Sequence, residues 1–149
     1  MIKFAYALLL ILILTTFVYS QTTVSTDITT STTWYKSSSP YNVINNIAVA
    51  AGAVLSIQPG VRVQFNSGIN MTINGVISAN GNNTDSIYFT RNSSVGTWGN
   101  ITINNTTFFD PSSQMSYCVV EYGGSSAINM SNSSTKLQVS NSLIRRNNY

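Results

Sequence analysis

The sequence predicts an all-β solenoid of short strands, for three reasons. Apolar and polar residues alternate in runs of three to five residues, which places the apolar side chains of each run on one side of a strand. Gly, Pro, Asn or Ser bounds each run, and no stretch after residue 20 has the apolar spacing that a helix needs. Similar apolar runs recur about every 18 to 25 residues, a repeat length typical of solenoids.

The first segment, residues 1–20, has the composition of a signal peptide. Lys3 supplies a positive charge, the apolar run 4–18 follows, and Ser20 suits the small-residue position before a cleavage site. We expect cleavage between Ser20 and Gln21, and therefore secretion or display at the cell surface. The alternative is an uncleaved membrane anchor, although the run of about 15 residues is shorter than the roughly 20 that span a bilayer.

Residues 21–33 are rich in threonine, which is β-branched and disfavours helix. They contain too few apolar side chains to form a core, so they are predicted to be a linker or a leading strand. An O-glycosylated stalk is a further alternative. Trp34, Tyr35, Pro40 and Tyr41 follow, and we expect these large apolar groups to cover the N-terminal end of the solenoid.

Residues 34–149 contain the predicted repeats, and their alternation assigns the side chains to faces. The residues expected inside are Leu55, Ile57, Val61, Val63, Phe65, Ile69, Met71, Ile73, Ile87, Phe89, Ile101, Ile103, Ile128, Met130, Leu137 and Val139. Hairpin signals are weak, because Asn74-Gly75 and Asn80-Gly81 flank a segment of only five residues. One coil cannot bury its apolar face alone, so about five coils are expected to stack roughly 4.8 Å apart.

Solenoids need a cap at each end, and no C-terminal cap is visible before Tyr149. We therefore expect the repeats to be incomplete at the C-terminus and the last coil to be open. Asn141 and Asn147 are expected to take part in an asparagine ladder, in which the side-chain amides of successive coils hydrogen-bond along the stack.

Six strings follow one another in an order found in a known repeat family: VAAGAVLSIQPGVRVQF, INGVISANG, SIYFT, TWGNITI, SYCVVEYGG and SNSLIRRNN. In this order the chain resembles the right-handed parallel β-helix repeat family, which is pectin-lyase-like in fold. The matching positions are Pro59-Gly60, Gly75, Ala79, Gly81, Phe89, Thr90 and Trp98-Gly99. The resemblance covers about residues 34–149 and implies a right-handed parallel β-helix. It implies no single activity, because this scaffold hosts lyases, hydrolases and adhesins.

Composition argues against several classes of function. Without residues 1–20 the chain has six basic and four acidic residues, a net charge of +2. This charge is too small, and the basic residues are too scattered, for a nucleic-acid-binding surface. Histidine is absent, which removes the usual general base of Ser or Cys triads and the commonest zinc ligand. Calcium takes six to eight oxygen ligands, and the acidic residues do not cluster. We predict no cofactor and no metal.

The carboxylates and the cysteine suggest no catalytic residue. Asp85 and Asp110 are expected in turns and Glu121 on the polar face, all solvated, whereas glycoside hydrolysis usually needs two carboxylates at a defined separation. Cys118 is the only cysteine, so no disulfide forms within the chain. Cys118 and Val120 are two residues apart and therefore lie on the same side of a strand, so we expect Cys118 to be a small, buried apolar residue. The alternative is a free thiol that pairs with another chain.

Eight N-x-Ser/Thr sequons are candidate glycosylation sites. They begin at Asn70, Asn82, Asn92, Asn100, Asn104, Asn105, Asn129 and Asn132. Random order of 18 Asn and 39 Ser or Thr gives roughly five, so composition bias is the alternative explanation. Four of these residues fall on the polar face (Asn70, Asn100, Asn104 and Asn129) and the others in turns, so all are expected to be accessible. The sequons at Asn104 and Asn105 overlap, and we expect only one of them to be modified.

These observations favour a secreted or cell-surface, glycosylated β-helix segment with a structural or an adhesion and recognition role. Its expected partners are carbohydrates or other surface proteins, with membrane contact only through a retained N-terminal anchor. The alternative is the N-terminal part of a polysaccharide-processing enzyme whose catalytic coils lie outside this chain. A third interpretation is an inert fragment.

Overall fold

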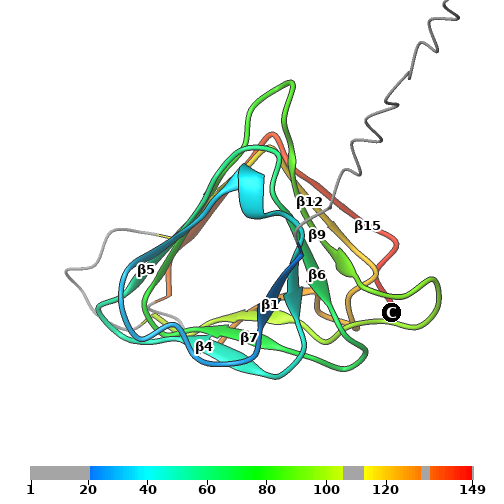
Figure 1. The fold of residues 1–149 in the computed structure, drawn as a ribbon, viewed down its shortest axis with the longest axis horizontal. Helices are drawn as coiled ribbons and strands as arrows, with labels where there is room; N and C mark the ends of the chain where they lie inside the picture. Colours follow the sequence, from blue (N-terminus) through cyan, green and yellow to red (C-terminus); the bar gives the residue numbers. More distant parts are fainter. Residues whose placement is uncertain (1–20, 106–112, 132–134, 149) are drawn as a thin grey trace, which may run out of the picture.

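The fold is all-β, as predicted, and its strands form three parallel sheets. The computed structural model describes residues 21–105, 113–131 and 135–148, so the predicted signal peptide lies outside the described residues. Figure 1 shows the sheets as the three walls of a triangle, with β6, β9, β12 and β15 on one wall, β4 and β7 on the second and β5 on the third. The described strands form open sheets and no closed barrel.

The strands are short, and every named pair is parallel. Sheet A, in spatial order, comprises β1 (Thr22–Val24), β3 (Tyr41–Val43), β6 (Arg62–Phe65), β9 (Ile87–Arg91), β12 (Cys118–Glu121) and β15 (Leu143–Arg145). Sheet B comprises β4 (Ile47–Val49), β7 (Met71–Ile73), β10 (Ile101–Ile103) and β13 (Ile128–Met130). Sheet C comprises β2 (Thr32–Trp34), β5 (Val54–Ile57), β8 (Val76–Asn80), β11 (Ser113–Ser116) and β14 (Leu137–Ser140). A 3-10 turn, η1 (Lys36–Ser38), precedes β3.

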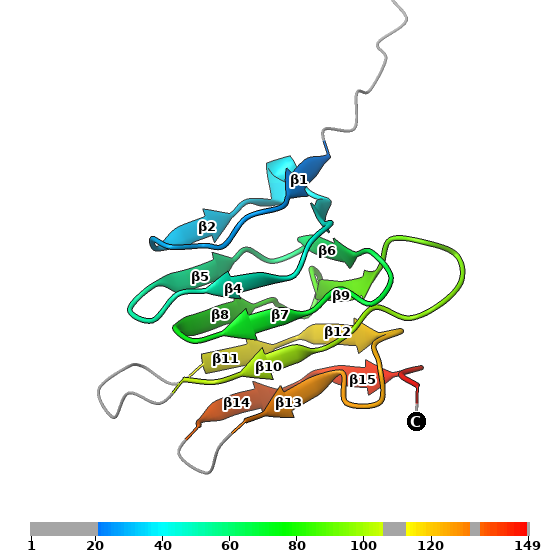
Figure 2. The same ribbon diagram turned by 90° about the horizontal axis from the view of Figure 1, so that it is seen from below.

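From β3 onward the chain passes through sheets A, B and C in turn and then returns to sheet A. Figure 2 shows the successive passes stacked as layers. Within sheet A, Val63 lies opposite Phe89 and Phe89 lies opposite Val120, so equivalent positions of successive passes form columns. This arrangement is consistent with the predicted solenoid. Residues 21–33 contribute β1 and the start of β2.

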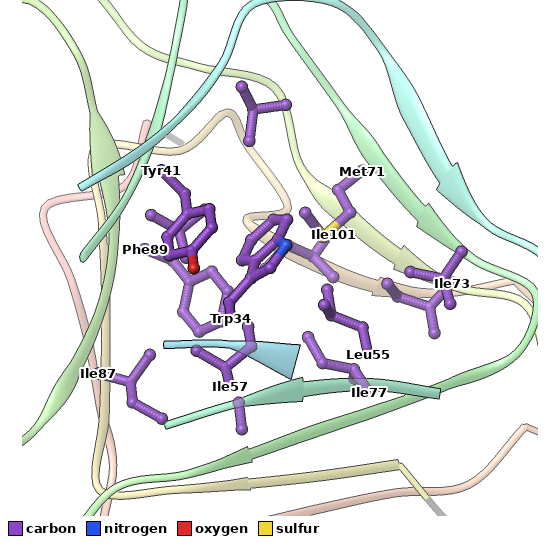
Figure 3. Packing of buried hydrophobic residues seen from close by; sticks show 14 of the residues in the cluster. Trp34, Tyr41, Leu55, Ile57, Met71, Ile73, Ile77, Ile87, Phe89 and Ile101 are labelled. Carbon is purple, nitrogen blue, oxygen red and sulfur yellow. The ribbon is translucent and has the colours of Figure 1, made fainter. Parts of the chain in front are cut away.

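The interior is apolar and is supplied by all three sheets (Figure 3). Except for Ile69, which is partly buried, the predicted interior residues from Leu55 to Ile103 are at most 3% exposed. Complete burial of such side chains contributes about 1.5–3 kcal/mol each. Period-2 alternation therefore assigned the faces of these strands correctly.

The two ends of the stack differ from each other. Trp34 and Tyr41 are buried and stack with their ring centroids 4.7 Å apart, whereas Tyr35, which we expected beside them, is exposed. At the other end, Met130 and Val139 are 48% and 45% exposed, although both were expected inside. The reason is that β13, β14 and β15 are the outermost described strands of their sheets, so no described strand covers them.

Asparagine side chains connect successive coils at the corner that leads into sheet B. The Asn70 backbone N–H donates to Asn46 Oδ1 at 2.8 Å, and the Asn100 backbone N–H donates to Asn70 Oδ1 at 3.0 Å. The ladder predicted at Asn141 and Asn147 takes another form, because the Asn147 side chain bonds backbone: its Oδ1 accepts from the Gly123 N–H at 2.8 Å.

The predicted period of about 18 to 25 residues is too short for the middle coils. Asn46 and Asn70 are 24 residues apart, but Asn70 and Asn100 are 30 apart, and Asn80 and Ser116, which also hydrogen-bond between coils, are 36 apart. Longer connections after β9 and β10 account for the difference. The connection after β9 projects from a corner of the triangle (Figure 1).

Candidate functional site

Two arginines and a tyrosine form a column at the carboxyl-terminal ends of three neighbouring strands of sheet A. Strands β9, β12 and β15 are neighbours, and Phe89 lies opposite Val120, which lies opposite Ile144. Arg91, Tyr122 and Arg146 each stand two residues further along the chain. In-register parallel strands stack equivalent positions about 4.8 Å apart, so the tyrosine lies between the two arginines.

The column is held by cation–π contacts and hydrogen bonds. Arg91 Cζ lies 3.9 Å from the centroid of the Tyr122 ring, and Arg146 Cζ lies 5.9 Å from it. Arg146 Nη1 donates to Tyr122 Oη at 2.8 Å, and Arg91 Nη1 donates to the Gly96 carbonyl at 2.9 Å. Tyr122 and Arg146 have φ values of 61° and 55°, in the left-handed region that turns the chain out of each strand. The tyrosine ring is therefore fixed against both guanidinium groups.

A pocket of about 460 Å³ opens beside this column. It is lined by Arg91, Gly96, Thr97, Tyr122, Arg146, Asn147 and Asn148. The Asn147 Nδ2 donates to the Val120 carbonyl at 3.2 Å, and the Asn148 backbone N–H donates to the Gly123 carbonyl at 3.0 Å. These bonds to the preceding coil hold one wall of the pocket in place.

Trp98 anchors the connection that forms the opposite wall. Its ring stacks on Phe65 with centroids 4.5 Å apart and is 1% exposed. Its indole Nε1–H donates to the Glu121 carbonyl at 2.8 Å. The connection after β9 is thus tied to two different coils, next to the column of Arg91 and Tyr122.

A buried carboxylate that pairs with an exposed arginine corrects one prediction. Glu121, expected to be solvated, is 6% exposed, and its Oε2 accepts from Arg145 Nε at 3.0 Å. The Thr90 hydroxyl donates to Oε1 of the same carboxylate at 3.4 Å. The charge of Arg145 is therefore balanced, whereas no described carboxylate lies within 4.0 Å of the guanidinium nitrogens of Arg91 or Arg146.

The other described carboxylates are occupied elsewhere. Asp27 Oδ1 accepts from the Ala48 backbone N–H at 2.8 Å, and Asp85 pairs with Lys36 at 2.6 Å on the surface. Asp110 lies outside the described residues. No described His, Cys, Asp and Glu residues form a group of three that could hold a metal ion. Each of the three described carboxylates is thus bonded to a different partner within the chain.

The sequons occupy different environments. Asn92 and Asn129 are exposed, Asn70, Asn82, Asn100 and Asn104 are half-buried, and Asn132 lies outside the described residues. Asn105 is 7% exposed, so the expectation that every sequon is accessible fails at this position. Besides Asn70, two sequon side chains bond asparagines of the preceding coil: Asn92 Nδ2 donates to Asn66 Oδ1 at 3.1 Å, and Asn104 Nδ2 donates to Asn74 Oδ1 at 2.9 Å.

Cys118 is a buried apolar residue, as its parity predicted. It is 1% exposed, and its thiol donates to the Ala79 carbonyl at 3.3 Å. Burial raises the pKa of Cys118 to about 12, and a hydrogen bond with Ser142 opposes the shift. Since the thiolate is the reactive form, burial removes both access and nucleophilicity.

We expect Cys118 to resist a water-soluble thiol reagent at about pH 8 in the folded chain and to react fully in urea. The folded chain keeps the proton between pH 9.0 and about 12 while the unfolded chain loses it. The contribution of this thiol to stability is therefore complete below pH 9.0 and decreases as the pH rises towards 12. Fast labelling without denaturant would contradict burial.

Comparison with known proteins gives no identification. No family model, curated protein or solved structure matches this chain. Among the described residues, no helix has the length and apolar character needed to cross a bilayer. From sequence, Arg145-Arg146 suggests contact with a sugar or an anion, but sequence reasoning did not bring Arg146 together with Arg91 and Tyr122. The available signal was that each of the three follows the apolar residues of a sheet A strand.

Proposed function

We propose that the chain is a secreted or cell-surface, glycosylated recognition module in which a right-handed parallel β-helix of the pectin-lyase-like type serves as a rigid scaffold. The three parallel sheets, visited in order by each coil, support this fold type. The observation that carries the functional proposal is the lining of the pocket, which contains two arginines, a tyrosine, a threonine and two asparagines but no carboxylate.

This lining suits binding more than hydrolysis. Arginine, asparagine and threonine side chains donate hydrogen bonds to hydroxyl and acidic groups, whereas a glycoside hydrolase usually needs a carboxylic acid and a carboxylate around the bond that breaks. The volume of about 460 Å³ falls within the roughly 300–1,000 Å³ common for small-molecule sites. A saccharide is therefore the proposed partner.

The test is to express the full chain in eukaryotic cells and to apply the secreted protein to an array of neutral and acidic glycans. We expect saccharide binding without new reducing ends or unsaturated products from the same polysaccharides. Cleavage by the purified chain would instead favour the polysaccharide-processing alternative. Absence of binding to every saccharide on the array would refute the recognition role.

Glycosylation is tested on the same sample. Removal of N-glycans should lower the mass, and peptide mapping should locate the glycans at exposed positions such as Asn92 and Asn129. Asn105 should be unmodified in the secreted chain, because a glycan on a side chain that is 7% exposed is incompatible with the fold. An unchanged mass would support composition bias as the origin of the sequons.

A further inference from the structure

We infer that the pocket beside Arg91, Tyr122 and Arg146 binds an anionic group, a carboxylate or a sulfate, carried by a saccharide. This inference rests on the proposed recognition function and specifies the chemistry of its ligand. It follows from the charge at the pocket, the remaining hydrogen-bond donors and the volume.

The charge at the pocket is positive, and no carboxylate of the described residues pairs with it. Arg91 and Arg146 both line it, and no described carboxylate lies within ion-pair distance of either, while the neighbouring Arg145 is neutralised by Glu121. Two like charges held against one tyrosine ring repel each other, and an anion bound beside them offsets that repulsion. The site is therefore electrostatically suited to a negatively charged group.

The two guanidinium groups keep donors for a ligand. Each guanidinium carries five N–H donors in a planar fork that matches carboxylate and other oxyanions. One hydrogen bond occupies Nη1 of each, from Arg91 to the Gly96 carbonyl and from Arg146 to Tyr122 Oη. These bonds fix the orientation of the forks and leave further N–H groups available. The backbone positions of Arg91 and Arg146 are two strand spacings apart, roughly 10 Å, with Tyr122 between them, so a ligand contacts the arginines from the side of the column that faces the pocket.

The remaining lining favours a saccharide over a free ion. A single inorganic anion is comparable in size with one or two water molecules, each of which takes about 30 Å³ in the liquid, and would fill little of the pocket of about 460 Å³. Thr97 and Asn148 offer neutral polar groups of the kind that bond sugar hydroxyls. The pocket is open on one side, since Gly96, Arg146 and Asn148 are exposed, so a chain of sugars can extend out of it.

The experiment measures binding of the secreted full chain to heparin, alginate and dextran, which are sulfated, carboxylated and neutral, at about 50 mM salt, where exposed charges are weakly screened. Arg91→Gln and Arg146→Gln should each weaken binding of the preferred anionic polysaccharide roughly tenfold, as expected for loss of a charge-assisted contact. Arg62→Gln is the matched control, because Arg62 also stacks on a tyrosine, Tyr88, at 4.8 Å but does not line the pocket. This control should change binding less than about twofold.

Far-UV circular dichroism and protection of Cys118 from thiol reagents verify that each variant is folded. If Arg91→Gln fails to fold, Arg146→Gln carries the test, because Arg146 is exposed and follows the last described strand. Heparin and alginate distinguish the sulfate from the carboxylate, and sodium sulfate is the competitor that represents a free ion.

Four results would overturn the inference. Equal losses in Arg62→Gln and the pocket variants would mean that only overall charge attracts the polymer. Displacement of heparin fragments by an equal molar concentration of sulfate would mean a site for a free ion. Binding of dextran alone, unaffected by the arginine variants, would refute the anionic ligand while the proposed recognition function stands, whereas no saccharide binding at all would refute both.

Discussion

Replacement of Trp98 by alanine is expected to lower the free energy of unfolding by about 3–5 kcal/mol, as large-to-small changes of buried aromatic residues do. The side chain is 1% exposed and stacks on Phe65 at 4.5 Å, so the change leaves a cavity between two coils. It also leaves the Glu121 carbonyl without the indole donor. Since domains are stable by only about 5–15 kcal/mol, urea unfolding followed by circular dichroism should show a large shift of the midpoint.

Trp98→Phe is the matched control. Phenylalanine keeps an aromatic ring against Phe65 but removes the Nε1–H bond to the Glu121 carbonyl, for which we expect about 1 kcal/mol plus a smaller packing term. Equal losses in the two variants would show that the hydrogen bond, not the stacked ring, stabilises this corner. A loss below about 1 kcal/mol in Trp98→Ala would contradict the packing seen here.

The faces of the strands could be predicted from sequence because the strand period is a local property. Val63 and Phe89 alternate with polar neighbours in their own segments, and both are completely buried. Trp98 was identified only through a resemblance, and its role as an anchor depends on Phe65 and Glu121, which belong to other coils. Local alternation contains no information about such pairs.

The candidate site could not be predicted because it depends on the lengths of the coils. The column forms only if residue 91 stacks on 122 and 122 on 146, and the connections between these strands differ in length. The burial of Glu121 was missed for the same reason, since its cover, Arg145, comes from the following coil. A repeat of constant length would have placed other residues opposite Tyr122 and Glu121.

The asparagines that connect coils could be predicted in part. Asn46, Asn70 and Asn100 each stand immediately before a sheet B strand, so their shared position is visible in the sequence. Two of them lie half-buried in a chain of hydrogen bonds whose donors are backbone N–H groups of the next coil. The sequons at Asn70 and Asn100 predict glycosylation, whereas in the structure both residues take part in hydrogen bonds between successive coils.

Gly75→Ala is expected to destabilise the fold by about 3 kcal/mol or more, the upper range for overpacking of a well-packed site. A Cβ at this position would lie 2.2 Å from the Ala53 carbonyl oxygen and 2.4 Å from that of Ala50. Both are backbone atoms of the preceding coil, and the Gly75 N–H also donates to the Val49 carbonyl at 3.1 Å. Neither oxygen can move without disturbing the contact between the coils.

Gly52→Ala separates this crowding from the ordinary conformational preference of glycine. Gly52 has φ of 80° and no atom within 4 Å of an added Cβ, so alanine there meets only the strain of a left-handed residue, about 1–2 kcal/mol. We therefore expect the midpoint of urea unfolding to fall further in Gly75→Ala than in Gly52→Ala. The reverse order would mean that segments 49–53 and 75–76 are not in the close contact described. The register of sheet C, in which Val54 lies opposite Val76, would then be wrong at this corner.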